Sequence, residues 1–158
     1  FTGSFLDEGF LIDYLTADEY FSFIGKLNNL DQAEIQQQLS PFEQFFKGEI
    51  HGKKKYIRDL SKENQKKVGI AGALLGKPDI LVLDKPFANL DPSTQYSVRD
   101  DLKRLDQETY VTMLISSHDL GHVTEFCQRI VILDHGQVAK DLHTTSETLK
   151  ELETYFAK

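Results

Sequence analysis

The chain of 158 residues is 40% hydrophobic and 27% charged, with a formal net charge of −7, which suits one globular unit or two small subdomains. The acidic balance argues against a chain-wide attraction to nucleic acid or anionic lipid. A single cysteine, Cys127, excludes an internal disulfide and is expected to be an ordinary packed thiol in a reducing cytosol.

Residues 1–12, FTGSFLDEGFLI, are predicted to hold the end of a strand and the loop after it. The chain begins abruptly at Phe1 rather than at a methionine, so we expect a fragment of a longer protein. No basic stretch followed by an apolar one is present, and no apolar run approaches the roughly 20 residues that span a bilayer.

The segment over residues 13–76 is expected to form a helical subdomain. A capping box, TADE, starts at Thr16 and opens a first helix. Asp31 opens a second, glutamine-rich helix, which Pro41 interrupts. Ser61 caps a third helix. The apolar face of this third helix carries Val68, Ala71 and Leu75.

From Asp79 onward, strands and helices alternate. Expected strands are Ile80–Leu83, Tyr110–Ser116 and Arg129–Leu133, the last turning at His135-Gly136 into Gln137–Lys140. Expected helices are 93–107, with Val98, Leu102 and Leu105 inward, Asp119–Cys127, and a last one carrying Leu149, Leu152 and Phe156. Apolar strands of this kind are typical of a mostly parallel sheet covered by helices. The fold class is therefore α/β, with a helical subdomain followed over residues 77–158 by the C-terminal half of such a sheet.

Polar side chains follow two of the expected strands directly. Asp84 ends the run ILVLD, and His118 follows the run MLISS. Ligands of open α/β sheets bind beyond the carboxyl ends of the strands, so Asp84 can hold Mg²⁺ and His118 can contact a phosphate. The plain alternatives are a loop aspartate and a surface histidine. Ser61 and Asp91 are further candidates, and both are equally explained as helix caps.

Four short segments occur in a fixed order: LSKENQKKV from Leu60, ILVLDKP from Ile80, ANLDP from Ala88 and ISSHDL from Ile115. In this order they resemble the nucleotide-binding subunits of ATP-binding-cassette (ABC) transporters, and the resemblance covers nearly the whole chain. It implies that LSKEN is the signature motif, LVLD the Walker B motif, NLDP the D-loop and the histidine of SSHDL the switch histidine. Each segment alone is weak evidence for the family, but four segments in this order are strong evidence.

The resemblance implies a P-loop NTPase-type sheet that binds ATP and Mg²⁺. Asp84 would hold Mg²⁺, His118 would contact the γ-phosphate, Asp91 would act across a dimer, and Lys85 occupies the position of the catalytic glutamate. The signature turn, which would contact the partner subunit's nucleotide, comprises Ser61, Lys62, Glu63 and Asn64.

The resemblance also implies partners. Two such subunits, identical or different, face each other head to tail, and the helical subdomain contacts transmembrane permease subunits. The protein would then lie on the cytoplasmic face of a membrane. No nucleic-acid partner is expected, because the basic run Lys53–Arg58 contains one aromatic residue, Tyr56, and is better explained as a solvated face.

One departure from the family pattern concerns the P-loop. No Walker A motif, G-x-x-x-x-G-K-[ST], is present, because none of the Gly-Lys pairs is followed by Ser or Thr. In the family this motif precedes the first residue seen here. We therefore expect weak ATP binding at best, and negligible hydrolysis, from these residues alone. Asp7 falls near the position of the Q-loop glutamine.

Two further departures change the chemistry. Lys85 replaces a glutamate that polarises the attacking water, and a protonated ammonium has no lone pair to accept a proton. Glu63 replaces the second glycine of the signature, where a carboxylate adds bulk and repels phosphate, by about 4 kcal/mol for a unit pair at ~4 Å. One hypothesis is that Glu63 and the Lys85 of a second subunit compensate each other across the dimer. The alternative is independent change at both positions, natural or engineered.

Two functions follow from these residues. The first is an ATP-binding subunit that couples nucleotide binding and hydrolysis to transport, which Asp84, Asp91 and His118 favour. The second is a degenerate, non-hydrolysing subunit that acts as a regulatory or structural partner, which Lys85 and Glu63 favour.

Overall fold

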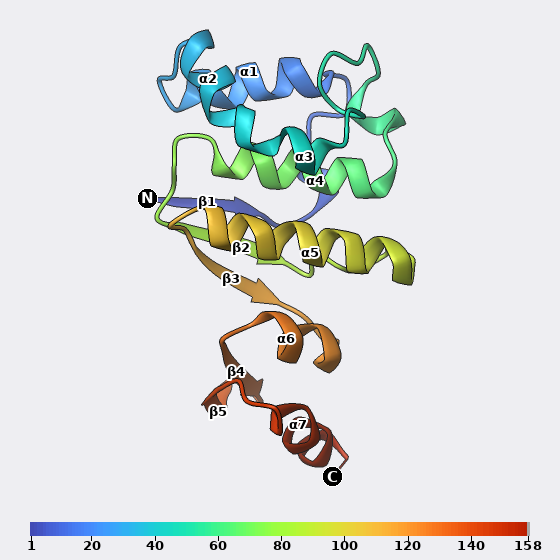
Figure 1. Cartoon of the computed structure of the whole chain (residues 1–158), viewed down its shortest axis with the longest axis vertical. Helices are drawn as coiled ribbons and strands as arrows, with labels where there is room; N and C mark the ends of the chain where they lie inside the picture. The colour runs from blue at the N-terminus through green and yellow to red at the C-terminus, as the bar shows by residue number, and fades with distance from the viewer. Residues whose placement is uncertain (158) are drawn as a thin grey trace. The chain divides into compact units, whose positions relative to one another are not determined.

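The computed structural model describes residues 1–157, which divide into two compact units, one over Phe1–Ser116 and one beginning at Ser117. Figure 1 shows the helices and strands of both. The predicted division into residues 1–12, 13–76 and 77–158 follows from the sequence motifs and stays a prediction. Across the described residues, no helix combines the length and apolar character needed to cross a membrane.

The first unit contains a parallel sheet with strand order β1-β2-β3, formed by Thr2–Phe5, Ile80–Asp84 and Thr112–Ser116. The register pairs Phe5 with Leu83 and Asp84 with Ser116, so the strands end together at one edge. This confirms the predicted parallel α/β arrangement.

Two helices, α4 (Lys62–Leu74) and α5 (Pro92–Glu108), cover one face of this sheet. The inward side chains of α5 are those predicted, Val98, Leu102 and Leu105. The other face leaves Ile80 and Leu114 42% and 63% exposed. Right-handed crossovers that step in one direction across a sheet place their helices on the same side. Within the first unit, the helices therefore cover one face of the sheet.

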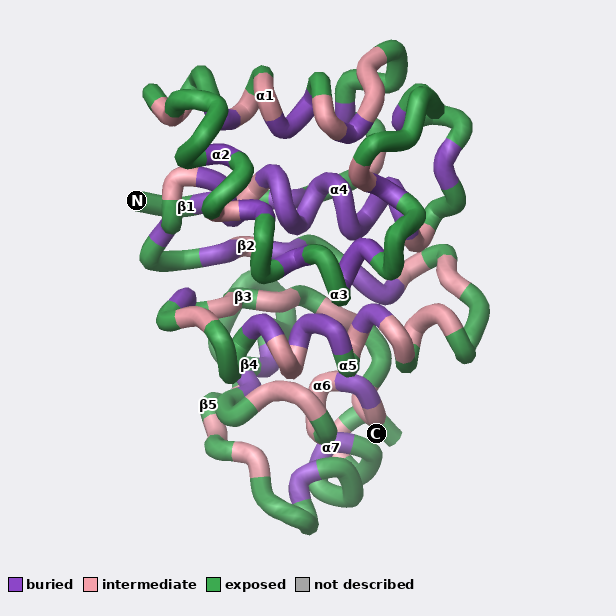
Figure 2. The backbone as a smooth tube through the Cα atoms, turned by 45° about the horizontal axis from the view of Figure 1, so that its top comes forward, coloured by how far each residue is buried: buried purple, intermediate pink, exposed green. Residues whose placement is uncertain are grey.

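Helix α4 is buried along nearly its whole length, as Figure 2 shows. It lies directly on β1, and the close approach requires glycine. A Cβ built on Gly69 would lie 2.2 Å from Cε2 of Phe5, which is closer than two carbon atoms can come. The start of this helix is thus fixed against the sheet by packing along its length.

A layer of helices lies above α4 in Figure 1 and corresponds to the predicted helical subdomain. It contains α1 (Ala17–Leu27), α2 (Gln32–Leu39) and α3 (Glu43–Phe46), with 3-10 turns at Glu8–Phe10, Ser40–Phe42 and Ile57–Asp59. The capping box at Thr16 is confirmed, and Asp31 forms a second one. The core of the layer comprises Phe21, Ile35, Leu39, Phe45 and Phe46.

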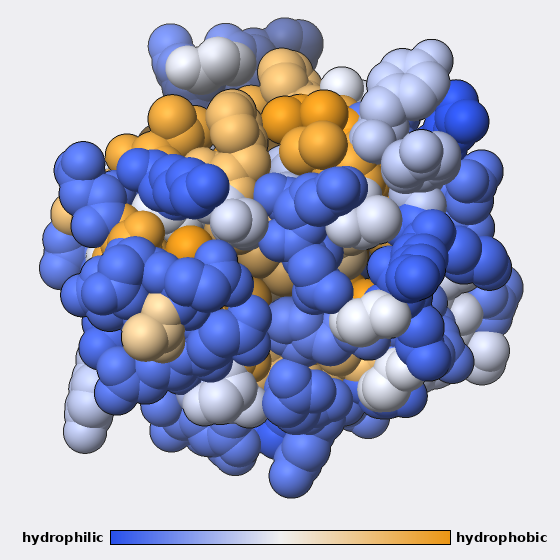
Figure 3. Space-filling view, turned by 90° about the horizontal axis from the view of Figure 1, so that it is seen from above, coloured by the Kyte–Doolittle hydropathy of each residue, from blue (hydrophilic) through white to orange (hydrophobic). Residues whose placement is uncertain are grey.

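This layer also leaves large apolar side chains exposed, among them Phe10, Tyr14, Phe23 and Leu27. Phe23 and Leu27 stand at helical spacing on α1, yet α1 buries its other side, because Phe21 stacks on Phe46. Figure 3 looks down on this layer from above and shows apolar surface gathered along one edge of the view. Exposed apolar surface of this kind is typical of interaction sites.

The second unit consists of α6 (Leu120–Phe126), the strands β4 (Arg129–Asp134) and β5 (Gln137–His143), and α7 (Thr148–Phe156). The strands are antiparallel, and the predicted His135-Gly136 turn has positive φ at both residues, 47° and 77°. The core of the second unit is formed by Ile130, Ile132 and Leu152, and Cys127 packs against this core. Burial raises the pKa of the Cys127 thiol, as expected for a packed cysteine.

Candidate functional site

The end of β2 presents the predicted metal ligand, Asp84, in an exposed position. Its Oδ1 accepts a hydrogen bond from the hydroxyl of Ser116, its register partner on β3. The same Ser116 oxygen accepts the backbone N–H of Lys85 at 2.9 Å. Ser116 therefore fixes both residues at the strand edge. A signal for this role is present in the sequence, since Ser116 is a hydroxyl residue at the end of the next predicted strand, two residues before His118.

Lys85 lies where the chain leaves the sheet. Its backbone is left-handed, with φ 47°, and its carbonyl accepts the N–H of Ala88 at 3.0 Å, which closes a turn. Its side chain is exposed, and its ammonium group makes no hydrogen bond or ion pair with any described residue. This residue therefore adds a positive charge to the edge but supplies no proton acceptor.

Asp91 caps α5. Its Oδ1 accepts the hydroxyl of Ser93 at 2.6 Å and the N–H of Thr94 at 3.1 Å, and its Oδ2 accepts the Thr94 hydroxyl at 2.6 Å. The Ser93 and Thr94 hydroxyls, together with the Thr94 N–H, lower the pKa of Asp91 from 3.8 to about 2. The structure thus shows the capping role that the sequence allowed. Any role of Asp91 across a dimer stays a prediction.

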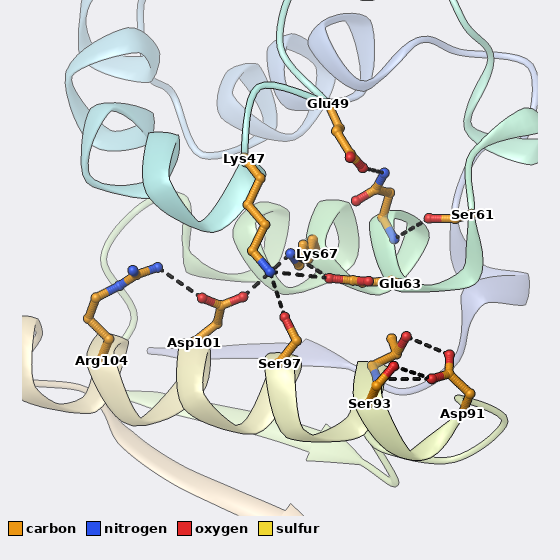
Figure 4. Close-up of polar contacts among 12 residues, drawn as sticks. Lys47, Glu49, Ser61, Glu63, Lys67, Asp91, Ser93, Ser97, Asp101 and Arg104 are labelled. Carbon is orange, nitrogen blue, oxygen red and sulfur yellow. Dashed lines mark hydrogen bonds and ion pairs between the residues drawn. The ribbon is translucent and has the colours of Figure 1, made fainter.

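The signature turn begins α4. Ser61 caps the helix by accepting the N–H of Asn64 at 3.2 Å. Ser61 and Lys62 are exposed, whereas Asn64 is 7% exposed and donates its side-chain amide to Glu49 at 2.8 Å. A group that approaches the start of the helix therefore meets the serine and the lysine first. Figure 4 shows this turn beside α5.

The Glu63 carboxylate is paired within its own unit. Its Oε1 lies 2.8 Å from Nζ of Lys67 and 3.8 Å from Nζ of Lys47. This carboxylate is therefore not the free charge that the sequence predicted, because two lysines neutralise it. Lys47 lies 16 residues before it in the chain, and no motif links the two.

The remaining candidates are His118 and Asp7. His118 is exposed in the second unit and makes no hydrogen bond or ion pair with a described residue, and the next residue, Asp119, caps α6. Asp7 is exposed and caps the turn Glu8–Phe10. Within the described chain, Asp84 and Lys85 make no hydrogen bond or ion pair with residues 61–64.

The end of β2 fits a magnesium site in which phosphate oxygens supply further ligands to the ion. Asp84 Oδ2 has no partner among the described residues, and Mg²⁺ in nucleotide sites is usually held by one or two carboxylates together with waters and phosphate oxygens. In the part of the chain that the structure describes, no group of three or more His, Cys, Asp or Glu side chains could hold a metal by itself. Asp84 therefore fits the role of a single protein ligand.

Comparison with known proteins decides the family. An uncharacterised ABC transporter ATP-binding protein of Synechocystis is 34% identical over 133 residues, which is 84% of this chain and 37% of that protein. The chain belongs to the family of ABC transporter ATP-binding proteins. A second such protein, YhaQ of Bacillus subtilis, is 31% identical over 86% of this chain and 43% of its own length.

A methionine import ATP-binding protein, MetN 1 of Acinetobacter baylyi, is 30% identical over 73% of this ABC chain and 32% of its own length. Thus the chain spans roughly a quarter to a half of the length of the curated ABC relatives that it matches. No family model matches it.

Solved structures of ABC proteins show the same fold. CbiO1 of Clostridium perfringens, described as part of the ABC transporter complex CbiONQ, superposes with a TM-score of 0.81 and 26% identity, over 98% of this chain and 61% of that one. An ATP-binding subunit of another ABC transporter gives a TM-score of 0.73 with 24% identity, over 94% and 65%. The predicted α/β architecture of P-loop NTPase type is therefore confirmed.

Proposed function

We propose that this chain forms the signature-bearing and C-terminal portion of an ATP-binding subunit, which couples ATP binding and hydrolysis to transport by separate membrane subunits. The observation that carries the proposal is the exposed Asp84 carboxylate at the shared strand edge, fixed by Ser116 and followed by a capped D-loop helix. Residues 1–12 would hold the Q-loop region, residues 13–76 the helical subdomain, and residues 77–158 the C-terminal part of the ATPase core.

Each site residue has a proposed task toward Mg-ATP. Asp84 orients the ion, which when bound neutralises phosphate charge, and Ser116 holds the carboxylate in place. His118 contacts a γ-phosphate, and Asp91 meets the second subunit. Residues 61–64 contact the nucleotide held by that second subunit, with Ser61 and Lys62 foremost because they are exposed.

The proposed partners are a second nucleotide-binding subunit and transmembrane permease subunits. Exposed apolar side chains on the helical layer support the second contact, since Phe10, Tyr14 and Leu27 are each more than half exposed. Binding to permease subunits would place the protein at the cytoplasmic side of a membrane.

The rate of hydrolysis depends on Lys85. The alternative of a non-hydrolysing subunit rests on this residue, because its exposed ammonium offers no lone pair to an attacking water. The relatives are ATP-binding proteins of transporters, which supports nucleotide binding in either case. We infer that this subunit binds ATP and hydrolyses it slowly.

The test is ATP binding and ATPase activity at the natural full length of the protein, for wild type, Lys85→Glu and Asp84→Asn. We expect Lys85→Glu to raise turnover about 10²-fold or more, the usual contribution of a general base. Asp84→Asn should weaken magnesium-dependent ATP binding. Substantial turnover with Lys85 in place would contradict the role given to this residue, and absence of ATP binding in wild type would overturn the proposed function.

A further inference from the structure

A chain of charged side chains joins the signature helix to its neighbours on α3 and α5, as Figure 4 shows. On α4, Glu63 contacts Lys67 at 2.8 Å. Lys67 lies 3.4 Å from Oδ2 of Asp101 on α5, and Arg104 holds the other oxygen of that aspartate at 3.0 Å. The two carboxylates are thus shared among cations from different helices.

Lys67 is the centre of this network. Its side chain is 1% exposed, and its ammonium group also lies 5.3 Å from the centre of the Phe45 ring. A buried ammonium group stays charged only where carboxylates or aromatic faces compensate for lost water. Glu63 and Asp101 supply that compensation, so the position of the Glu63 side chain is tied to the packing between α4 and α5.

Lys47 is the more exposed of the two lysines that contact Glu63. It ends α3 with a left-handed backbone, φ 51°, and its ammonium group donates to Ser97 Oγ on α5 at 2.6 Å while lying 3.8 Å from Glu63. Its side chain is half exposed. Both lysines therefore approach the same oxygen of Glu63, Oε1, and the Glu63 side chain is 25% exposed.

We infer that Lys47 and Lys67 are positioning residues for the signature turn. They hold the Glu63 carboxylate against α5 and neutralise it, so that the first turn of α4 presents Ser61 and Lys62, and no free negative charge, to the phosphates of a nucleotide. The inference rests on the proposed function, because it concerns the contact of this turn with a nucleotide bound by a second subunit. It also explains how a glutamate can stand in the turn without the cost of phosphate repulsion.

The experiment measures dimerisation of the natural full-length protein by analytical ultracentrifugation, with a magnesium complex of a non-hydrolysable ATP analogue. Lys47→Met is the main variant, because Lys47 is half exposed and its loss leaves the buried Lys67 in place. Glu63→Gln and the double variant complete a cycle. Lys54→Met is the matched control, because it removes one charge from an exposed position where the ammonium group has no hydrogen bond or ion pair with a described residue.

We expect Lys47→Met to weaken nucleotide-dependent dimerisation by about threefold to fivefold, the effect of losing one partly exposed ion pair. In the Glu63→Gln background the same substitution should have no effect, because the charge to be neutralised is gone. Lys54→Met should behave as wild type. An equal loss in both backgrounds would show a purely structural role for Lys47 and overturn the inference alone. A wild type that does not dimerise with the nucleotide would overturn the proposed function together with it.

Discussion

The hydroxyl of Ser116 donates to the carboxylate of Asp84, and the two residues are register partners at the ends of neighbouring parallel strands. This pair links the end of β3 to the Walker B position on β2. Because the same oxygen receives the Lys85 N–H, one side chain orients both residues whose chemistry distinguishes this site.

Replacing Ser116 by alanine should therefore raise the Mg²⁺ concentration needed for ATP binding. Partners that orient a metal ligand typically contribute about 10-fold or more to metal affinity. The measurement is a magnesium titration of ATP binding at the natural full length. Ser117→Ala is the neighbouring control, since its hydroxyl accepts the N–H of Asp119 instead. An unchanged magnesium midpoint in Ser116→Ala would contradict the positioning role.

Asp91 should make stability depend on pH in the acid range. Its pKa is about 2 in the folded chain against an ordinary 3.8, so its ionised form is favoured by folding. The stability it contributes is present above pH ~4 and is lost as the pH falls through the folded value. Urea unfolding of wild type and Asp91→Asn between pH 2 and 7 tests this. The asparagine keeps a cap but cannot titrate, so wild type should lose its advantage on acidification. A constant difference at all pH values would contradict it.

Lys67 should be important for the stability of the first unit. Lys67→Met keeps the length of the side chain but leaves Glu63 and Asp101 with fewer cations in a buried place. We expect the free energy of unfolding to fall by about 3 kcal/mol, as when one partner of a buried ion pair is removed. Lys67→Arg should recover part of this. Denaturant unfolding provides the measurement, and a loss no larger than that of exposed Lys54→Met would refute the assignment.

The 158 residues alone should bind Mg-ATP weakly, because they contain no Walker A sequence. Isothermal titration should give a dissociation constant of about 1 mM or weaker, near −4 kcal/mol. Hydrolysis should be indistinguishable from buffer. Tight binding to these residues would show that a different segment holds the phosphates.

Local patterns in the sequence predicted those features that neighbouring residues determine. The capping box at Thr16 and the cap at Ser61 depend on atoms within three residues, and both formed as expected. The strand before Asp84 followed from a run of apolar residues, and the His135-Gly136 turn followed from residues that tolerate positive φ. The order of the four motifs predicted the family, because that order is a property of the sequence and needs no contact between distant segments.

Contacts between distant segments were decided by tertiary structure alone. The lysines that neutralise Glu63, the amide of Asn64 turned to Glu49 and the hydroxyl that fixes Asp84 come together only when α3, α4, α5 and the strands pack. The buried side of α1 and the covered face of the sheet were likewise set by packing and crossover geometry. Sequence spacing fixes which side chains can share a helix or strand, whereas the partner of a charge depends on which elements lie beside it.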